Sequence, residues 1–328
     1  MIVVTGGAGF IGSNLVAALE ARGIVDVAVV DRFGSDDKWR NLAKRELAAL
    51  VPPEEVMAFL DAHAAEVDVV FHLGAISATT ERDVDLIVRN NVVLSMELWR
   101  WCAWRGARLI YASSAATYGG GEHGFVDDEQ PDALAMLRPL NAYGWSKHLF
   151  DRRVARAVVR GEPAPPQWAG LKFFNVYGPN ERHKGDMMSV VAKLHPQLAT
   201  GKGARLFKSH RPDYDHGGQL RDFIWVGDCV DVMLWLLDNP GVSGLFNVGT
   251  GRARSFRDLA EATFAALGRA PDIEYFDMPE ELQGKYQYFT QADTGKLRAA
   301  GFDLPFTELE EGVRRYVQDF LSTDDPYA

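Results

Sequence analysis

Two side chains at helical spacing, Tyr143 and Lys147, have the chemistry of an acid–base pair. Residues four positions apart share one face of a helix. A lysine cation close to a phenol favours the phenolate, so we expect a lowered pKa at Tyr143 and an acid or base that works near neutral pH. Lys147 can also hold a ribose, and Ser114, which closes a predicted strand, can hydrogen-bond a substrate oxygen. This Tyr-x-x-x-Lys spacing is common by chance, and an ordinary surface pair is its alternative.

A glycine-rich turn near the start of the chain makes the spacing more specific. An apolar run at residues 2–4 leads into Gly7-Ala8-Gly9-Phe10-Ile11-Gly12, which fits G-x-G-x-x-G, with Gly6 just before it. Glycines here let the backbone approach a pyrophosphate, which the N-terminus of the following helix stabilises. Asp31 ends the next apolar run 19 residues after Gly12. A glycine turn without ligand is the alternative, but the strand, the helix and Asp31 together favour dinucleotide binding.

The residues that follow the second apolar run leave the type of dinucleotide open. Asp31 would accept a hydrogen bond from an adenosine ribose hydroxyl, which favours NAD. Arg32 and Lys38 could instead hold a 2′-phosphate, which favours NADP, or belong to a solvated loop. We expect NADP, with NAD as the alternative.

Continuous apolar runs that alternate with helical patterns predict the architecture. Strands without polar alternation are typical of parallel sheets that are covered on both faces. We predict an α/β fold, namely a Rossmann-type doubly wound parallel sheet with a smaller α/β substrate-binding lobe. The dinucleotide-binding domain is expected at 1–174, with 222–247 returning to it, and the lobe at 175–221 and 248–328.

The composition excludes several classes of protein. Among 328 residues, 35 Lys and Arg stand against 45 Asp and Glu, a net charge of −10, so we expect no nucleic-acid binding. Two cysteines without metal-type spacing, and no apolar run long enough for a membrane span, fit a cytoplasmic protein outside the membrane. Residues 200–221 are expected to form a loop. His and Asp side chains at 208–220 lack fixed ligand spacing, so we expect no metal.

Further segments carry a resemblance to known enzymes. Beside the glycine turn, Ser114, Tyr143 and Lys147, they are Leu73-Gly74-Ala75, Tyr111-Ala112-Ser113-Ser114-Ala115-Ala116-Thr117-Tyr118-Gly119-Gly120, Asn175-Val176-Tyr177-Gly178-Pro179, His183-Lys184-Gly185, Phe246-Asn247-Val248-Gly249-Thr250-Gly251-Arg252-Ala253 and Phe289-Thr290-Gln291-Ala292-Asp293. The chain resembles the extended short-chain dehydrogenase/reductase family, that is, the NAD-dependent epimerases and dehydratases, and within it the epimerases of ADP-heptose. The glycine turn is shared very widely, whereas the last three segments are much more selective.

This resemblance implies inversion of one carbinol carbon, C-6 of the heptose in ADP-D-glycero-D-manno-heptose, to give the L-glycero-D-manno form. Tightly held NADP would take hydride from that carbon and return it to the other face of a transient ketone. Such chemistry needs an acid or base on each face, and the resemblance assigns these roles to Tyr143 and Lys184. Lys184 could instead be a cation that holds cofactor or phosphate.

The resemblance also implies binding residues, position by position. Cofactor contacts are expected at Gly6, Gly9, Phe10, Ile11, Gly12, Asp31, Arg32, Lys38, Leu73, Gly74, Ala75, Ile76, Ser77, Asn90, Lys147 and Val176. Substrate contacts are expected at Ser114, Asn175, Asp186, Lys193, Phe207, Arg221 and Tyr286. Three positions depart from the family pattern. This chain has Asp186 where the family has a Ser, Lys193 where it has a His and Pro53 where it has a basic residue.

Two other functions stay open at this stage. One is another nucleotide-sugar epimerase or a dehydratase of the same family, although Ala115-Ala116-Thr117-Tyr118 lacks the carboxylate that a dehydratase would want. The other is a non-catalytic NADP-sensing protein, which tends to lose the Tyr or the Lys that this chain retains. The resemblance implies a role in forming a lipopolysaccharide-core precursor and a homo-oligomer, a homopentamer. Trp99, Trp101 and Trp104 could mark an interface or pack in the core.

Overall fold

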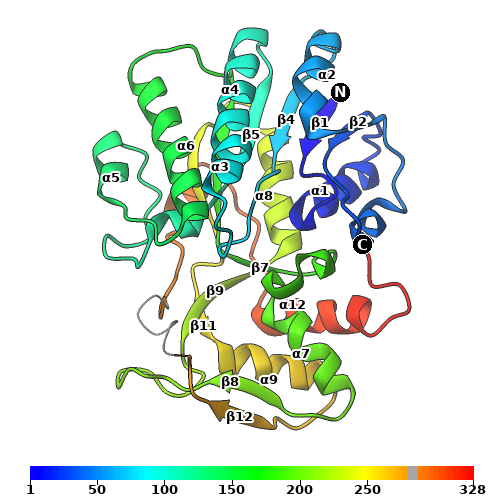
Figure 1. Ribbon diagram of the computed structural model, residues 1–328, viewed down its shortest axis with the longest axis vertical. Helices are drawn as coiled ribbons and strands as arrows, with labels where there is room; N and C mark the ends of the chain where they lie inside the picture. Colours follow the sequence, from blue (N-terminus) through cyan, green and yellow to red (C-terminus); the bar gives the residue numbers. More distant parts are fainter. Residues whose placement is uncertain (280–286) are drawn as a thin grey trace.

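The computed structural model describes residues 1–279 and 287–328. Figure 1 shows a larger unit built around a sheet and, below it, a smaller unit of short strands and helices. The sheet has seven strands, all parallel, in the order β10-β6-β5-β4-β1-β2-β3. Its strands are β1 (Ile2–Thr5), β2 (Val27–Val30), β3 (Ala49–Val51), β4 (Val69–His72), β5 (Arg108–Ser114), β6 (Trp168–Phe173) and β10 (Gly244–Val248). The predicted Rossmann-type α/β fold is confirmed.

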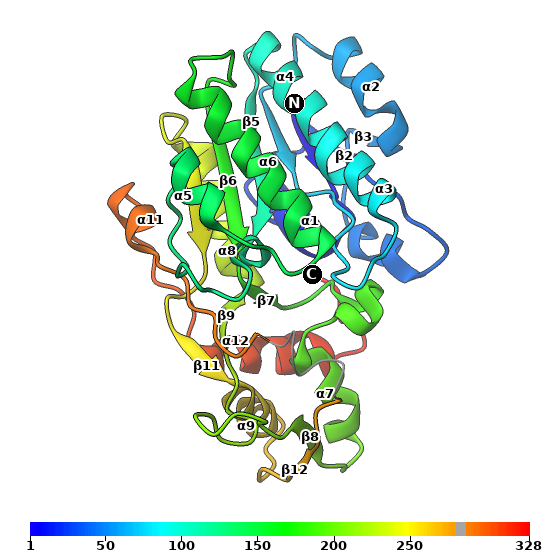
Figure 2. The same ribbon diagram turned by 60° about the vertical axis from the view of Figure 1, so that its left-hand side comes forward.

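Helices cover both faces of this sheet (Figure 2). They are α1 (Phe10–Ala21), α2 (Val56–Ala62), α3 (Val84–Ile87), α4 (Leu94–Arg105), α5 (Pro131–Met136), α6 (Ala142–Val159), α8 (Val226–Asp238) and α11 (Gly295–Ala299). Successive residues of β1 enter different cores. Ile2 and Val4 pack in the cluster that includes α1 and α8, whereas Val3 packs in the cluster that includes α2, α4 and α6. Burial on both faces explains why the strand has no polar alternation.

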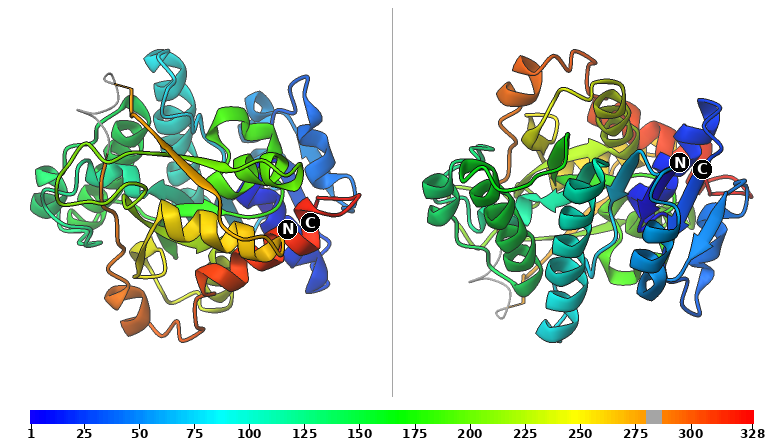
Figure 3. Two further views of the ribbon diagram at one scale, coloured as in Figure 1. Left: turned by 90° about the horizontal axis from the view of Figure 1, so that it is seen from below. Right: turned by 90° about the horizontal axis from the view of Figure 1, so that it is seen from above.

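The smaller unit combines a three-stranded sheet, a two-stranded sheet and several helices. They are β7 (Asn175–Tyr177), β8 (Ala204–Phe207), β9 (Leu220–Trp225), β11 (Ala253–Ser255), β12 (Ile273–Phe276), α7 (Val190–Ala199), α9 (Phe256–Ala266) and α12 (Leu309–Arg315). The strand orders are β11-β9-β7 and β12-β8. Seen from below, α9 and α12 lie side by side (Figure 3). Ser255 begins α9 with a reciprocal capping box. Its hydroxyl accepts a hydrogen bond from the Asp258 amide, and the Asp258 carboxylate accepts one from the Ser255 amide.

The expectation of a loop over residues 200–221 is wrong in part. β8 occupies Ala204–Phe207, β9 begins at Leu220, and residues 208–219 connect them. Strand β8 pairs with β12, which lies about 70 residues later in the chain, at Ile273–Phe276. A four-residue strand whose partner is so distant has almost no local pattern, and this is why the sequence does not reveal it.

The three tryptophans of the predicted helix divide between its two sides. Trp99 and Trp101 are buried in the core with α6, whereas Trp104 is 73% exposed at the end of α4. No helix within residues 1–279 and 287–328 is both long and apolar enough to cross a membrane. Within the same residues, no three His, Cys, Asp or Glu side chains gather as ligands for a metal ion.

Candidate active site

Helix α6 brings Tyr143 and Lys147 to the carboxyl end of β5. Asn141 begins the helix by accepting a hydrogen bond from the Gly144 amide at 2.8 Å. Gly144 is required here, because a Cβ at this position would lie only 2.6 Å from the carbonyl oxygen of Ala116. The Ser114 side chain lies close enough to the Tyr143 phenol to affect its ionisation, and its hydroxyl accepts from the Ala116 amide at 3.1 Å. The three predicted catalytic residues of this motif therefore lie together, with Lys147 buried and Tyr143 and Ser114 half-buried.

The expected lowering of the tyrosine pKa is wrong for this structure. Burial raises the pKa of Tyr143 above its usual value, the hydrogen bond with Ser114 opposes that rise, and the Asp151 carboxylate adds to it. Burial also lowers the pKa of Lys147 to about 8, against the attraction of Asp151. A low-dielectric site disfavours the phenolate and the ammonium alike, so spacing alone does not make the phenol acidic.

A chain of buried hydrogen bonds supports this helix from the side of β1 and β4. His72 Nδ1 lies 2.7 Å from Thr5 Oγ1, and its Nε2 lies 2.8 Å from Ser95 Oγ. Burial, with a smaller effect of the Lys147 charge, lowers the pKa of His72 to about 3, so the ring is neutral. Asn91 then ties the 73–77 turn to α6, since its amide group exchanges two hydrogen bonds with Ile76, at 2.8 and 2.9 Å, and donates to Ser146 Oγ at 3.0 Å.

Sequence reasoning missed His72 and Asn91. Asn91 lies in a π-helical segment, Val88–Val93, between α3 and α4. Such single-turn bulges occur often at functional sites, but no residue pattern in this stretch announces one. The neighbouring Asn90, which was predicted, lines the cavity described next and donates to the carbonyl of Leu86 at 2.8 Å.

A cavity of about 160 Å³ at the carboxyl edge of the sheet collects many of the predicted cofactor residues. Its lining residues are Thr5, Gly6, Val30, Asp31, Arg32, Lys38, Pro53, Gly74, Ala75, Ile76, Asn90 and Leu94. Two glycines shape the turn beside it. Gly6 has φ of +69°, and a Cβ there would lie 2.5 Å from the Gly74 amide nitrogen; at Gly12 it would lie 2.1 Å from the Gly6 carbonyl oxygen. The turn therefore takes the form that a pyrophosphate needs, with no side chain at its glycines and the N-terminus of α1 behind it.

Asp31 serves both the glycine turn and its basic neighbours. Its Oδ2 accepts from the Ala8 amide at 2.9 Å, and its Oδ1 accepts from the Arg32 amide at 2.7 Å. Lys38 Nζ lies 2.6 Å from Oδ1 and donates to the Arg32 carbonyl at 2.9 Å. The Arg32 guanidinium is exposed and pairs with Glu54. This part of the cavity thus carries one carboxylate and two cations.

Lys184 lies near the start of α1. Its ammonium is 5.0 Å from the centre of the Phe10 ring, within the range of a cation–π interaction. Burial lowers the pKa of Lys184, and the buried Glu181 carboxylate opposes this. Glu181 is held by the Ser189 amide at 2.6 Å and the Ser189 hydroxyl at 2.5 Å.

The remaining predicted substrate residues spread over the smaller unit. Asn175 belongs to β7, as does Val176, a predicted cofactor contact, and Phe207 ends β8 with its ring 4.9 Å from that of Phe276. Arg221 is buried in β9, with its guanidinium 5.7 Å from the Phe256 ring. Two exposed residues, Asp186 and Lys193, meet through a 2.6 Å hydrogen bond from the lysine to the aspartate carbonyl. Tyr286 lies outside the described residues.

Comparison with known proteins gives the class of enzyme. The NAD-dependent epimerase/dehydratase family matches residues 2–249, and the chain belongs to this family. Membership of this family supports a nicotinamide cofactor. The glycine cradle, helix N-terminus and paired charges at the cavity fit such a group.

The similar proteins narrow the class further. ADP-L-glycero-D-manno-heptose-6-epimerases from Nitratidesulfovibrio vulgaris and Fusobacterium nucleatum are 52% and 45% identical to this chain, each over 100% of both chains. The crystal structure of the Helicobacter pylori ADP-L-glycero-D-manno-heptose-6-epimerase matches with a TM-score of 0.77 and 27% identity, over 98% of this chain and 96% of that one. The Thermus thermophilus UDP-glucose 4-epimerase, in complex with NAD, matches with a TM-score of 0.73 and 27% identity, over 95% and 96%. These names agree with the epimerase expected from the sequence.

Proposed function

We propose that this chain inverts C-6 of the heptose in ADP-D-glycero-D-manno-heptose and so forms ADP-L-glycero-D-manno-heptose. The observation that carries the proposal is the 52% identity, over the full length of both chains, with a heptose 6-epimerase, in a chain whose Ser114, Tyr143 and Lys147 lie together. The placement of Ser114 beside Tyr143 is the arrangement that an alcohol oxidation needs, because one hydroxyl can exchange a proton while the other orients the substrate oxygen.

The proposed mechanism gives each residue a separate task. A bound nicotinamide would supply the hydride chemistry, that is, removal of a hydride from the carbinol carbon and its return. Tyr143 takes the hydroxyl proton on one face, Ser114 orients the oxygen, and Lys147, whose pKa of about 8 keeps it largely charged at neutral pH, favours the phenolate. Lys184 is the acid or base for the other face, and its lowered pKa suits proton transfer. A role for Lys184 in holding phosphate is the alternative.

We further propose NADP as the form of the cofactor. Arg32 and Lys38 line the adenosine end of the cavity, where a 2′-phosphate would replace Asp31 as the partner of Lys38. Asp31 would keep its bonds from the Ala8 and Arg32 amides. Nucleotide released from the purified protein by denaturation should be NADP or NADPH. Recovery of NAD alone would overturn the NADP assignment and leave the epimerase assignment standing.

The substrate lobe, the assembly and the location complete the proposal. We assign Asn175, Asp186, Lys193, Phe207, Arg221 and Tyr286 to substrate binding. We propose two domains, 1–174 with 222–247 and 175–221 with 248–328, with two changes to these boundaries: all of β9 goes to the smaller domain, whose three-stranded sheet contains it, and α11 goes to the larger one, against which Leu297 packs. A cytoplasmic homo-oligomer of five chains is inferred. Light scattering should then give five times the chain mass of 36.4 kDa.

The direct experiment follows the inverted carbon by NMR. Incubation with ADP-D-glycero-D-manno-heptose in deuterated water should yield the L-glycero-D-manno epimer with little deuterium at C-6, because the hydride stays on the cofactor. Substantial deuterium at that carbon would indicate deprotonation at carbon and would reject the mechanism. A panel of nucleotide sugars tests the substrate. If a nucleotide-hexose is turned over and ADP-heptose is not, a 4-epimerase is favoured instead, as the likeness to the Thermus thermophilus enzyme allows.

A further inference from the structure

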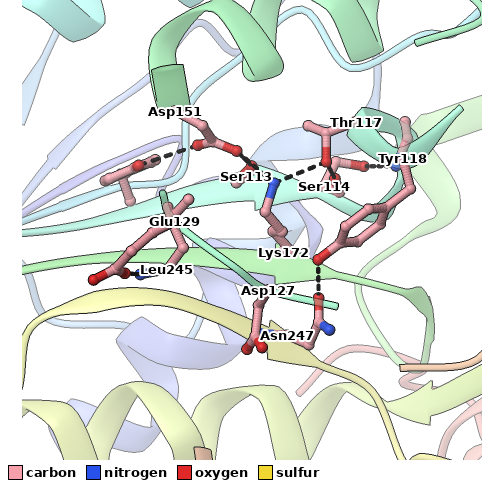
Figure 4. A network of polar contacts seen from close by, with 12 residues as sticks. Ser113, Ser114, Thr117, Tyr118, Asp127, Glu129, Asp151, Lys172, Leu245 and Asn247 are labelled. Atoms are coloured by element: carbon pink, nitrogen blue, oxygen red, sulfur yellow. Dashed lines mark hydrogen bonds and ion pairs between the residues drawn. The ribbon is translucent and has the colours of Figure 1, made fainter. Parts of the chain in front are cut away.

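A buried ion pair lies directly behind the catalytic motif. Asp151 of α6 and Lys172 of β6 meet at 2.7 Å between Oδ2 and Nζ, and both side chains are 0% exposed (Figure 4). Removing two charges from water carries a large desolvation penalty, and such a pair adds little to stability compared with apolar residues of the same size. A role other than stability is therefore worth seeking for it.

The Asp151–Lys172 pair is bonded to the segment that carries Ser114. Asp151 accepts from the hydroxyls of Ser113, at 2.6 Å, and Tyr111, at 3.1 Å. Lys172 donates to Thr117 Oγ1 at 2.9 Å, and the Thr117 hydroxyl donates in turn to the Ser114 carbonyl at 2.8 Å. These bonds hold the end of β5 and the 3₁₀ turn that follows it (Ala115–Tyr118) on both sides of Ser114, as Figure 4 shows.

The same pair is in register with the catalytic residues of the helix. Tyr143, Lys147 and Asp151 follow one another at intervals of four residues on α6, so they share one face of it. Lys172 stands opposite Ser113 in the ladder between β5 and β6, and β6 leads into Asn175 at the start of β7. One ion pair thus joins three segments, each of which contributes a residue to the site.

The charge of the pair also reaches the catalytic groups. The Asp151 carboxylate raises the pKa of both Tyr143 and Lys147, although burial has the larger effect on each. Lys172 is the cation that compensates this carboxylate at contact distance. Other titratable groups that respond to the pair are His148 on α6, Tyr111 on β5 and Tyr118 in the 3₁₀ turn; Glu129 acts on Tyr111, and Asp127 on Tyr118.

We propose that Asp151 and Lys172 are positioning residues for catalysis: their ion pair fixes the Tyr143 helix against the Ser114 turn and balances the charge that faces the phenol. This inference rests on the proposed acid–base role of Tyr143. Neither residue touches the substrate, so their removal should change kcat and its pH dependence more than KM.

The test compares two single variants that leave opposite charges. The quantity to follow is the limb of the pH profile of kcat that is lost in Tyr143→Phe, which we call the Tyr143 limb. Lys172→Met leaves an unpaired carboxylate near Tyr143. Because this charge disfavours ionisation of the phenol, the Tyr143 limb should move to higher pH. Asp151→Asn leaves a cation and should move the same limb to lower pH. The pKa of Lys147 should shift in the same direction as that of Tyr143 in each variant. The direction of the shift therefore does not depend on which of the two groups sets the limb. Each kcat should fall about tenfold at the parent optimum, as misplacement of a catalytic group does.

Three further variants exclude a merely structural role. The double variant Asp151→Asn with Lys172→Met carries neither charge, so the limb should return toward its parental pH. Lys172→Arg keeps the cation, so the limb should stay at its parental pH. Lys44→Met, which removes the lysine of an exposed pair with Asp325, should leave the limb unmoved. Limbs that stay in place, or that move together in one direction, in folded variants with full cofactor content would overturn the proposal. If Lys172→Met does not fold, the direction given by Asp151→Asn decides.

A failure of the proposed function can be told apart from a failure of this inference. If the parent protein inverts no nucleotide sugar, the function fails before any variant is compared. The ionisation of Tyr143 can then be followed directly by NMR of ¹³C-labelled tyrosine, with Tyr143→Phe identifying its signal. Opposite shifts of that titration in the two single variants would still support the pair, and the absence of a shift would still reject it.

Discussion

Two regions of this molecule hold their polar side chains in opposite ways. At the carboxyl edge of the seven-stranded sheet, His72, Asp151 and Lys172 are at most 1% exposed, and each has defined partners. In the connection between β8 and β9, Arg211 and Asp213 form a pair that is about half exposed. Buried polar networks have one favourable arrangement, because any unpaired group in a low dielectric is costly. Exposed pairs contribute little and rearrange easily in water.

This difference suggests a division of labour between the two regions. The edge of the sheet has the rigidity that proton and hydride transfer require, since both depend on fixed short distances. The connection between β8 and β9, whose Arg211–Asp213 pair is exposed, can adjust to the substrate that we propose for the smaller unit. Variants at the edge should therefore change kcat, and variants in the smaller unit should change KM.

The largest effect is expected from Tyr143→Phe. Loss of the phenol hydroxyl removes a general acid–base group, so kcat should fall by about 10²-fold or more while KM changes little. Turnover measured by NMR, with cofactor content as the control for folding, checks this. Near-normal turnover would remove Tyr143 from the reaction and with it the contrast between the two regions.

The buried edge should also respond to acid. The native state keeps His72 neutral down to a pKa of about 3, whereas the unfolded chain takes up a proton near the ordinary value of 6.5. The unfolded state thus binds more protons between these values, so stability is full above pH 6.5 and falls as the pH drops toward 3, by on the order of a few kcal/mol. Denaturant unfolding at several pH values measures this. His72→Asn should make the free energy of unfolding depend less on pH. His123→Asn, at an exposed position, should leave that pH dependence unchanged.

A moderate effect in KM is expected from the smaller unit. Arg221→Met removes a guanidinium that we assign to substrate binding, so KM should rise about tenfold, the value of one good charge-assisted contact, with kcat retained. Arg205→Met is the matched control, because Arg205 pairs with the exposed Glu274 on β12. A drop in kcat with constant KM would place Arg221 with the catalytic edge instead.

The smallest effect is expected where the chain departs from its family. Asp186 is exposed, and its carbonyl, not its carboxylate, accepts the hydrogen bond from Lys193. Asp186→Ser, which restores the family residue, should therefore change KM by no more than about twofold, as exposed substitutions usually do. A change of tenfold in steady-state KM would show that the carboxylate itself contacts the substrate.

The sequence predicts the parts of the site that depend on neighbours in the chain. The glycine turn, Asp31 and the Tyr143–Lys147 spacing are readable because each needs only a few residues and a regular helix or strand. Asn91 and β8 are not readable, since a π-helical segment and a short strand with a distant partner leave no periodic signal. The pKa of Tyr143 was predicted in the wrong direction because burial, which outweighs spacing, is a property of the folded chain.

Local order along the chain therefore determined the class of enzyme: a strand, a glycine turn and a helix place a dinucleotide, and a four-residue interval places a phenol beside an amine. Only the tertiary structure decided which charges surround that phenol. Asp151 and Lys172 are 21 residues apart in sequence and look like ordinary charged positions, yet folding brings them to 2.7 Å in a site without water access. Electrostatic interactions depend on distance and burial rather than on order in the chain, and both are set by packing.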